Sequence, residues 1–393
     1  MDIPNPAGTV TTRAQPLRVC YFGTYRQEYS RNQIMIEGLR QAGVIVTECH
    51  ESLWHGIEDR VQAASGGWLR PAFLGRVLRA YWCLLGNYRR VGNYDVLVVG
   101  YPGQFDVFLA RLLAWLRRKP LVWDIFMSIY LVALERGLDK RSRFTIGLLR
   151  CLEWAACRLP DRLILDTSEY VAWFGKTHGV PTQRFRLVPT GADDRLFHPL
   201  PSPMPESRAF HVIYYGTFIR NHGVEYIVEA ARLLADDRSI RFEFIGDGPE
   251  REKAQALARQ YRLENVTFEQ WLEKAELVQR VAQANVCLGA FGTTPQSLMT
   301  VQNKIYEGMA MAKPVITGDS PAIRQVLEHF TDIYLCERQS PQALADAIRT
   351  LKNDPGLCKV LGENCYRVFH EKFDLIHTGQ CFARHLISAI GKR

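Results

Sequence analysis

Short apolar runs in the first half of the chain are each bounded by polar or glycine-rich segments, and helical patterns separate them. The run at 17–23 ends in a glycine, a helical pattern follows at about 32–42, and a second apolar run begins at 44. Strands that alternate with helices in this way predict a parallel, doubly wound α/β sheet. The strands expected in this half are 17–23, 44–47, 95–100, 121–123 and 162–165, with a last strand that ends within 186–191.

A second series of the same kind follows a Pro/Ser-rich run that ends near Ser207. This run reads as a linker, so two Rossmann-like domains are expected at 17–200 and 209–370. A last helix within 371–393 is expected to return to the first domain. Ligands of such sheets bind at the carboxyl ends of the strands, and we expect those ends to face each other across a cleft. The second series comprises strands at 211–215, 242–245, 266–268, 284–288 and 314–317, with helices at 224–234 and 250–261.

The stretch 302–317, QNKIYEGMAMAKPVIT, carries the most informative chemistry. Asn303 and Lys304 mark a helix start, Glu307 lies one turn later, and Pro314 ends the helix before a buried strand. A helix start offers free N–H groups to a diphosphate, and a nearby carboxylate can accept bonds from ribose hydroxyls. The pattern indicates a nucleotide-sugar site. The alternative is that Glu307 is a solvated glutamate of the first helical turn.

The ten cysteines form no C-x-x-C pair, which favours reduced thiols in a cytosolic protein over a disulfide framework. We expect no signal peptide and no membrane-spanning segment, because no uncharged apolar run approaches about 20 residues. The histidines His178, His198 and His222 lack metal-ligand spacing, so no metal site is expected.

Positive charge is concentrated in the first half of the chain. Residues 1–200 hold 26 Lys and Arg against 18 Asp and Glu, whereas 201–393 hold 23 of each. Residues 61–94 contain no acidic residue, and their five arginines alternate with apolar residues. Such a segment is typical of a helix in the interface of an anionic membrane, and the alternative is a core helix with solvated arginines. Its members are Arg70, Arg76, Arg79, Arg89 and Arg90, with Trp68, Phe73 and Trp82 as the side chains expected to insert.

Four motifs, in order, resemble the GT-B glycosyltransferases of family 4. They are VPTGADDRLFHP (188–199), YYGTFIRNHGVEYIVEAARLL (214–234), FIGDGPER (244–251) and NKIYEGMAMAKPVIT (303–317), and GTYRQEYSRN near the start is compatible with them. The resemblance implies two Rossmann-like domains, a donor site in the second, an acceptor site in the first, retention of anomeric configuration, and neither metal nor cofactor.

The chain departs from the family pattern at three positions. The first of two glutamates eight residues apart is replaced by Met299, and two cations beside the first glycine turn are replaced by Thr217 and His222. A metal-free transfer must still stabilise the charge on the leaving diphosphate. Arg220 and Lys304 are the candidates for this role, and the alternative is that both are ordinary surface charges.

The expected site residues fall into three groups. Asp124, Arg220, Lys304 and Glu307 are expected to be catalytic, with Asp124 positioning the acceptor or taking up its proton; the alternative for Asp124 is a helix cap. The donor-binding group is Gly216, Thr217, His222, Gly246, Asp247, Gly248 and Asn303. The acceptor-binding group is Gly23, Thr24, Arg26, Arg31 and Ser128, in which the two arginines would hold an acceptor phosphate.

Together these features predict a retaining enzyme that transfers a sugar from a UDP- or GDP-linked donor. The expected acceptor is a lipid-linked intermediate or a polysaccharide in surface glycan assembly, on the inner face of the cell membrane and with no nucleic-acid partner. The alternatives are a nucleotide-sugar epimerase of the same fold and a homologue that only binds the nucleotide sugar.

Overall fold

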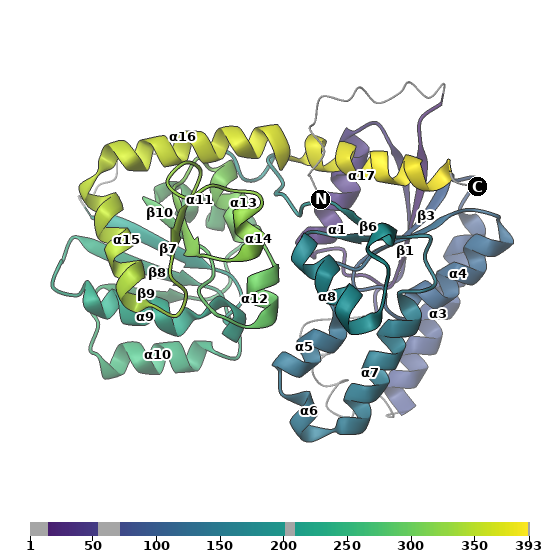
Figure 1. The fold of residues 1–393 in the computed structure, drawn as a ribbon, viewed down its shortest axis with the longest axis horizontal. Coiled ribbons are helices and arrows are strands. Elements are labelled where there is room, and N and C mark those ends of the chain that lie inside the picture. The colour runs from purple at the N-terminus through teal and green to yellow at the C-terminus, as the bar shows by residue number, and fades with distance from the viewer. Residues whose placement is uncertain (1–14, 54–70, 201–208, 392–393) are drawn as a thin grey trace. The chain divides into compact units, whose positions relative to one another are not determined.

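The computed structural model describes residues 15–53, 71–200 and 209–391 (Figure 1). The chain divides into two compact units. Unit 1 consists of residues 1–190 and 375–393, and unit 2 consists of residues 191–374. No helix in the described ranges is both long and apolar enough to cross a bilayer.

Unit 1 contains a parallel sheet with the strand order β2-β1-β3-β4-β5-β6. Strands β3, β4 and β5 lie centrally and have almost no exposed side chains, because helices cover both faces of the sheet. The strands are β1 (Arg18–Gly23), β2 (Ile45–His50), β3 (Val96–Val99), β4 (Leu121–Asp124), β5 (Arg162–Leu165) and β6 (Phe185–Leu187).

Crossovers between parallel strands are right-handed, so the direction in which the chain moves decides which face each helix covers. The connection from β1 to β2 crosses the sheet in one direction and places α1 on one face. The later connections, from β2 through to β6, cross the sheet in the opposite direction and place their helices on the other face. The helices of unit 1 are α1 (Ser30–Gln41), α3 (Pro71–Arg90), α4 (Asp106–Leu116), α5 (Ile129–Glu135), α6 (Leu138–Arg141), α7 (Arg143–Ala156), α8 (Ser168–His178), the 3₁₀ turn η2 (Thr182–Arg184) and α17 (Leu375–Ile390).

The last helix, α17, lies against α1 on the same face of the unit 1 sheet (Figure 1). The two backbones touch, because a Cβ on Gly38 would lie 2.7 Å from the Leu375 carbonyl and a Cβ on Gly379 would overlap the Gly38 carbonyl. Apolar residues of α17 such as Phe382 and Leu386 join the core beneath α1.

Unit 2 contains a second parallel sheet with the order β12-β11-β10-β7-β8-β9. In chain order this is the Rossmann arrangement 3-2-1-4-5-6, with the strand order reversing between β7 and β10. The strands are β7 (Phe210–Tyr215), β8 (Ile240–Ile245), β9 (Val266–Glu269), β10 (Val286–Leu288), β11 (Val315–Gly318) and β12 (Tyr334–Cys336). The helices are η3 (Arg220–His222), α9 (Val224–Leu233), α10 (Arg251–Gln260), α11 (Lys274–Gln283), α12 (Pro295–Met299), α13 (Asn303–Ala310), α14 (Pro321–Arg324), α15 (Pro341–Asn353) and α16 (Pro355–Lys372).

The predicted doubly wound α/β class is confirmed, with small shifts at several boundaries. Residues 191–200, assigned above to the first domain, pack with unit 2, where Ala192 and Phe197 join the core around α13. Helix α13 begins at Asn303, where the sequence pattern placed the helix start, and ends at Ala310 before the left-handed residue Ala312.

Candidate functional site

The carboxyl edge of the unit 2 sheet brings together the turns that follow β7 and β8. Gly216 and Gly246 have positive φ angles of 133° and 127°, and a Cβ on Gly246 would overlap the Gly216 carbonyl. Only glycine fits this contact without strain. The turn after β7 lies beside the position where strand order reverses, and the turn after β8 is its neighbour on the next strand; open α/β sheets bind ligands at such a reversal.

Lys304, the second residue of α13, extends over the Gly216 turn. A Cβ on Gly216 would lie 3.0 Å from the Lys304 Nζ, and that Nζ lies 4.0 Å from the centre of the Tyr214 ring. The side chain is buried, and burial lowers the pKa of Lys304 to about 7 against an opposing effect of Glu307. Lys304 is therefore not an ordinary surface charge.

Glu307 lies one helical turn beyond Lys304 and is half-buried. Burial raises the pKa of Glu307 to about 7, while a hydrogen bond from Tyr215 and the charge of Lys304 oppose the rise. This environment differs from that of a solvated first-turn glutamate. No side chain caps the helix start. The Ile305 N–H donates to the Gln302 carbonyl, so within the described residues the N–H groups of Asn303 and Lys304 are the ones available to a ligand.

His222 occupies the position of an expected cation but does not supply a charge. Its Nδ1 lies 2.6 Å from the Thr217 carbonyl and 3.4 Å from the Lys304 Nζ. Burial, together with the charge of Lys304, holds the pKa of His222 well below its usual value. The half-buried Thr217 contributes its carbonyl, which also accepts a hydrogen bond from the Tyr214 hydroxyl.

Arg220 lies on the short η3 turn between Thr217 and His222 and is exposed. Its guanidinium has no hydrogen bond or ion pair among the residues that the structure describes. The Arg220 carbonyl packs closely against Gly292, where a Cβ would overlap it. This contact fixes the backbone of the turn and leaves the charged side chain available.

Two further arginines at this edge were missed by the sequence analysis. Arg251 is buried, and its Nη1 donates to the Gly246 carbonyl over 2.6 Å. Arg338, just after β12, donates to the Gly292 and Asp319 carbonyls over 2.6 Å each. Arg251 was visible as the last residue of the FIGDGPER motif, whereas no local pattern marks Arg338.

Asp247 is exposed, and its Oδ1 accepts a hydrogen bond from the backbone N–H of Gly248 over 2.7 Å. Gly248 has a φ of 150°, and a Cβ there would meet the Phe218 carbonyl at 2.6 Å.

Met299 on α12 is a buried core residue, so the position of the first glutamate offers no carboxylate.

In unit 1, the loop after β1 is held by a residue that the sequence analysis did not single out. Asp106, the first residue of α4, accepts hydrogen bonds from the Thr24 N–H over 2.7 Å and from the Thr24 hydroxyl. Gly23 has a φ of 138°, and a Cβ there would meet Asp106. Arg26 in the same loop is partly exposed and lies 3.9 Å from Glu28, too far for a strong pair.

The structure corrects the roles expected for Arg31 and Asp124. Both side chains are fully buried, and the Arg31 Nε and Nη2 each donate to the Asp124 carboxylate over 2.9 Å. The Arg31 Nη1 donates to the Val188 carbonyl. This pair ties the carboxyl ends of β4 and β6 to α1, so neither group is open to an acceptor.

Ser128 is also a structural residue rather than an acceptor contact. Its hydroxyl caps α5 by accepting from the Leu131 N–H and donates to the Glu153 carboxylate over 2.5 Å. Glu153 in turn contacts His178 at 3.0 Å inside the core. Ser128, and not Asp124, is thus the cap of the helix that follows β4.

One cluster of side chains in the described ranges has the composition of a cation site. Potential ligand atoms of Asp194, His370 and Asp374 all lie within 4.8 Å of one another. The His370 Nδ1 lies 3.6 Å from the Asp374 Oδ2, and the two residues are four positions apart in sequence, which accounts for their proximity.

The two Rossmann-like sheets and the glycine turns of unit 2 define the GT-B class of protein. Residues 209–354 match the family model described as Glycosyl transferases group 1. The second Rossmann-like domain is thus similar to the group 1 glycosyltransferases, and the predicted GT-B fold is confirmed.

Curated relatives match part of the chain only. An alpha-D-kanosaminyltransferase of Streptomyces kanamyceticus is 28% identical over 176 residues, 44% of each chain. The lipopolysaccharide core biosynthesis glycosyltransferase LpsD of Rhizobium meliloti (strain 1021) is 27% identical over 150 residues, 38% of this chain and 41% of LpsD. The matched region spans less than half the length of these two relatives.

Solved structures of GT-B proteins match nearly the whole chain. A sucrose-phosphate synthase from Thermosynechococcus elongatus superposes with a TM-score of 0.70 at 18% identity, covering 96% of this chain and all of the other. Anabaena HepE in complex with UDP and glucose gives 0.67 at 16% identity, covering 95% and 100%. At these identities the likeness concerns the fold.

Proposed function

We propose that the protein is a retaining glycosyltransferase that takes a sugar from a nucleotide diphosphate donor. The observation that carries this proposal is the buried Lys304, held over the Gly216 turn at the start of α13. A cation and free N–H groups converge there at the strand-order reversal, which suits a diphosphate.

The individual roles follow from the positions of the groups. Lys304 stabilises the negative charge that grows on the leaving diphosphate, and Arg220 adds a second cation from η3. Glu307 accepts hydrogen bonds from the ribose hydroxyls. Gly216, Gly246 and Gly248 let the backbone approach the phosphates, with Thr217, His222, Asp247 and Asn303 lining the same edge. No nucleophile is required, because the leaving phosphate takes the proton of the attacking acceptor on the same face.

The acceptor side is proposed at the loop after β1, where Gly23, Thr24 and the partly exposed Arg26 lie. Arg26 is the remaining candidate for an acceptor phosphate, because Arg31 is neutralised by Asp124. We propose a lipid-linked or polysaccharide acceptor in surface glycan assembly on the inner face of the cell membrane. The similarity to a glycosyltransferase of lipopolysaccharide core biosynthesis supports this assignment.

A homologue that only binds nucleotide sugars is the second candidate, favoured by the buried Met299 in place of the first glutamate. Donor hydrolysis separates the two. UDP- and GDP-sugars would be screened by thermal shift, and the stabilising donor incubated without acceptor. Slow release of nucleoside diphosphate that is lost in Lys304→Met supports the transferase. Binding without any release, with acceptor present or absent, contradicts it.

A further inference from the structure

Helix α4 exposes a row of large apolar side chains to solvent. Phe108, Leu112 and Trp115 follow one another at helical spacing on its outer side, and Trp115 is 67% exposed. The opposite side of α4 packs on the sheet through Val107 and Ala114, which are fully buried. The helix is therefore apolar on two sides, and only one of them faces the core.

Helices α3 and α7 repeat this arrangement. On α3, Ala80, Leu84 and Tyr88 are buried, whereas Leu78 and Trp82 point outward and Trp82 is 78% exposed. The exposed side chains of α7 are Phe144, Leu148 and Trp154.

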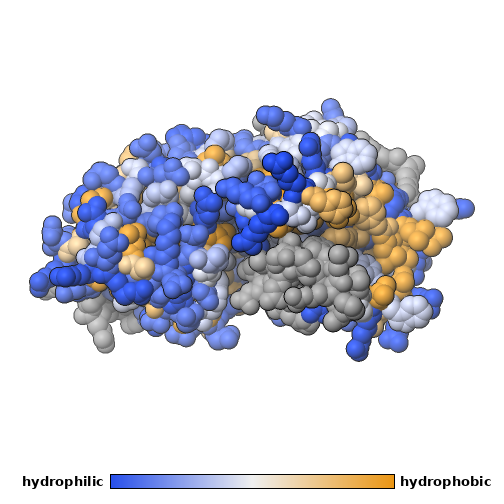
Figure 2. Space-filling model, turned by 90° about the horizontal axis from the view of Figure 1, so that it is seen from below, coloured by the Kyte–Doolittle hydropathy of each residue, from blue (hydrophilic) through white to orange (hydrophobic). Residues whose placement is uncertain are grey.

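The three helices form a continuous layer on one face of the unit 1 sheet, because successive right-handed crossovers place them side by side. The Tyr81 hydroxyl on α3 donates to Asp106 on α4 over 2.8 Å. The Arg111 Nη1 on α4 donates to the Leu159 carbonyl just beyond α7 over 3.0 Å. Figure 2 shows apolar side chains gathered over one region of unit 1. We call the outward sides of these helices the α3–α4–α7 face.

The exposed charges on the three helices and on residues 117–119 are all basic, and one of them, Arg111, pairs with the partly exposed Asp161 just beyond α7. The three helices and residues 117–119 hold ten Arg and Lys. Their two acidic residues, Asp106 and Glu153, are both buried and hydrogen-bonded inside the unit. Such a face attracts an anionic partner and would repel a second copy of itself.

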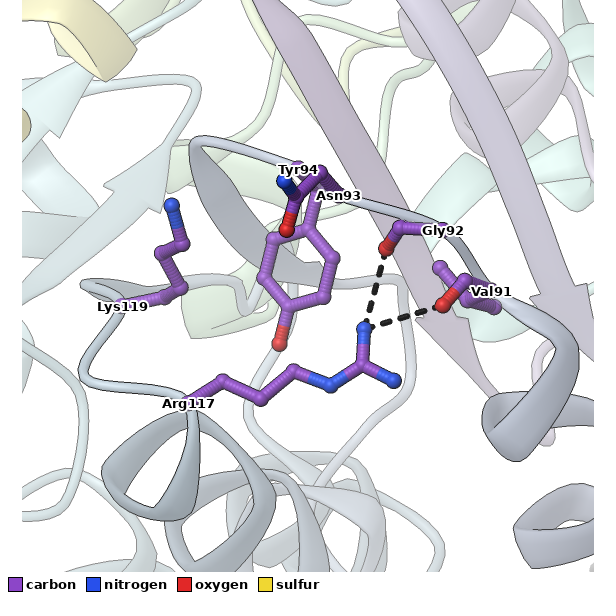
Figure 3. A pocket seen from close by; sticks show the side chains of 6 residues that line it. All are labelled: Val91, Gly92, Asn93, Tyr94, Arg117 and Lys119. Atoms are coloured by element: carbon purple, nitrogen blue, oxygen red, sulfur yellow. Dashed lines mark hydrogen bonds between the residues drawn. The ribbon is translucent and has the colours of Figure 1, made fainter.

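A pocket of about 440 Å³ lies at one end of this face, where α3 and α4 both end (Figure 3). Arg117 reaches the carbonyls of Val91 and Gly92, each over 3.0 Å, and its guanidinium lies 4.5 Å from the Tyr88 ring centre. Lys119 lines the same pocket, and its ammonium has no hydrogen bond or ion pair in the part of the chain that the structure describes. The neighbouring Arg89 and Arg90 are exposed.

We propose that the α3–α4–α7 face docks the protein on an anionic lipid bilayer. The apolar side chains enter the interface, the surrounding arginines meet anionic headgroups, and the pocket of Arg117 and Lys119 takes a lipid phosphate. The sequence analysis placed the membrane contact within 61–94, of which 61–70 and the side chains of 71–74 lie outside the described residues. The structure adds α4 and α7, so the contact is a surface of three helices and not one segment.

The test is flotation with vesicles of phosphatidylcholine alone or with phosphatidylglycerol, at low and high salt and without nucleotide. Binding should require the anionic lipid and weaken with salt. The double variant Leu112→Asp/Trp115→Asp should lose at least about tenfold in binding, since it removes insertion and adds repelling charge. Trp271→Asp is the matched control, because Trp271 is a comparably exposed tryptophan of unit 2 and should leave binding unchanged.

Lys119→Glu tests the pocket separately. The substitution removes one basic group near the membrane surface and adds an acidic one, so binding to anionic vesicles should fall about fivefold or more. All variants change solvent-exposed or partly exposed groups, so thermal unfolding and nucleotide affinity should match the wild type. That match separates failure of docking from failure of the proposed transferase activity.

Three outcomes overturn the proposal. The first is that the wild-type protein does not bind anionic vesicles at low salt. The second is that the double variant binds these vesicles as well as the wild type does. The third is that the wild-type protein self-associates without binding vesicles and the double variant does not self-associate. In the last case the face is a contact between copies of the chain.

Discussion

The Nζ of Lys304 lies 3.4 Å from the Nδ1 of His222, a distance at which two positive charges would repel each other strongly. His222 gives up its charge, since its pKa is held well below the usual value. The position of an expected cation is thus filled by a neutral ring, and a lysine from α13 reaches the same place.

Lys304→Met should lower kcat by about 10²–10³, the typical cost of removing one group that stabilises developing charge. Nucleotide affinity should fall less, because the charge on the diphosphate is greatest in the transition state. Steady-state kinetics with the donor found by the screen measure both. Arg220→Met should show a smaller loss of the same kind, and Lys359→Met, on an exposed lysine of α16, should show none. Wild-type turnover in both Lys304→Met and Arg220→Met would exclude these cations.

Glu307→Gln should weaken nucleotide binding by about 1.5–3 kcal/mol, the range for a hydrogen bond to a charged group. Titration calorimetry with UDP and GDP measures the loss, and a 2′-deoxy nucleotide provides the control. If Glu307 accepts from both ribose hydroxyls, the variant should lose less affinity for the deoxy nucleotide, which keeps only the 3′-hydroxyl, than for the ribonucleotide. Equal loss for both nucleotides would move Glu307 away from the ribose.

Nucleotide affinity should be greatest near pH 7 and fall on either side. Lys304 has a pKa of about 7 and must be protonated to attract the diphosphate, so affinity decreases as the pH rises above that value. Glu307 also has a pKa of about 7 and must be ionised to accept, so affinity decreases as the pH falls. Lys304→Met should remove the alkaline decrease, and Glu307→Gln the acidic one. A flat profile in the wild type contradicts the assignment.

Lys304→Met should also stabilise unit 2 by about 1–2 kcal/mol near neutral pH, as removal of an unfavourable functional group commonly does. The pKa of Lys304 is lowered from 10.5 to about 7, so the folded state disfavours the proton that the unfolded chain binds. The increase in the free energy of unfolding should be complete below pH 7 and should disappear as the pH rises towards 10.5. Urea unfolding at several pH values measures it, and a destabilised variant at pH 7 would show that Lys304 holds the fold together.

The Arg31–Asp124 pair should behave as a structural unit. Asp124→Asn leaves a buried guanidinium without its counter-charge and should cost about 3–5 kcal/mol of stability. Arg31→Met/Asp124→Leu should recover most of this loss, whereas Arg349→Met, which breaks an exposed pair, should cost about 1 kcal/mol or less. Urea unfolding measures all three. A stable Asp124→Asn protein without turnover would instead return Asp124 to the catalytic site.

Local patterns were sufficient to predict most of the fold. Strands such as β3 and β10 are continuous apolar runs bounded by a polar residue and a glycine, and this signal follows directly from burial on both faces of a parallel sheet. Strand β12, Tyr334–Cys336, was not predicted from the sequence. Helix α13 was visible because its start, its carboxylate and the proline that follows are close in sequence.

Other parts of the site depend on contacts that no local pattern encodes. Arg31 and Asp124 are 93 residues apart in sequence. Each lies near a strand or helix end, so the local sequence does not distinguish a polar group that binds a ligand from one that pairs inside the core. The outward residues of α4 are likewise indistinguishable from core residues by spacing, because periodicity shows that a helix side is apolar but not whether another element covers it.

The packing of α17 on α1 has a consequence for how the protein is made. Unit 2 is a single stretch of chain, whereas unit 1 needs residues 375–390, which the ribosome synthesises after all of unit 2. The side of α1 that receives Phe382 and Leu386 must wait uncovered while unit 2 emerges and folds. Unit 1 therefore cannot complete its core until unit 2 has been synthesised.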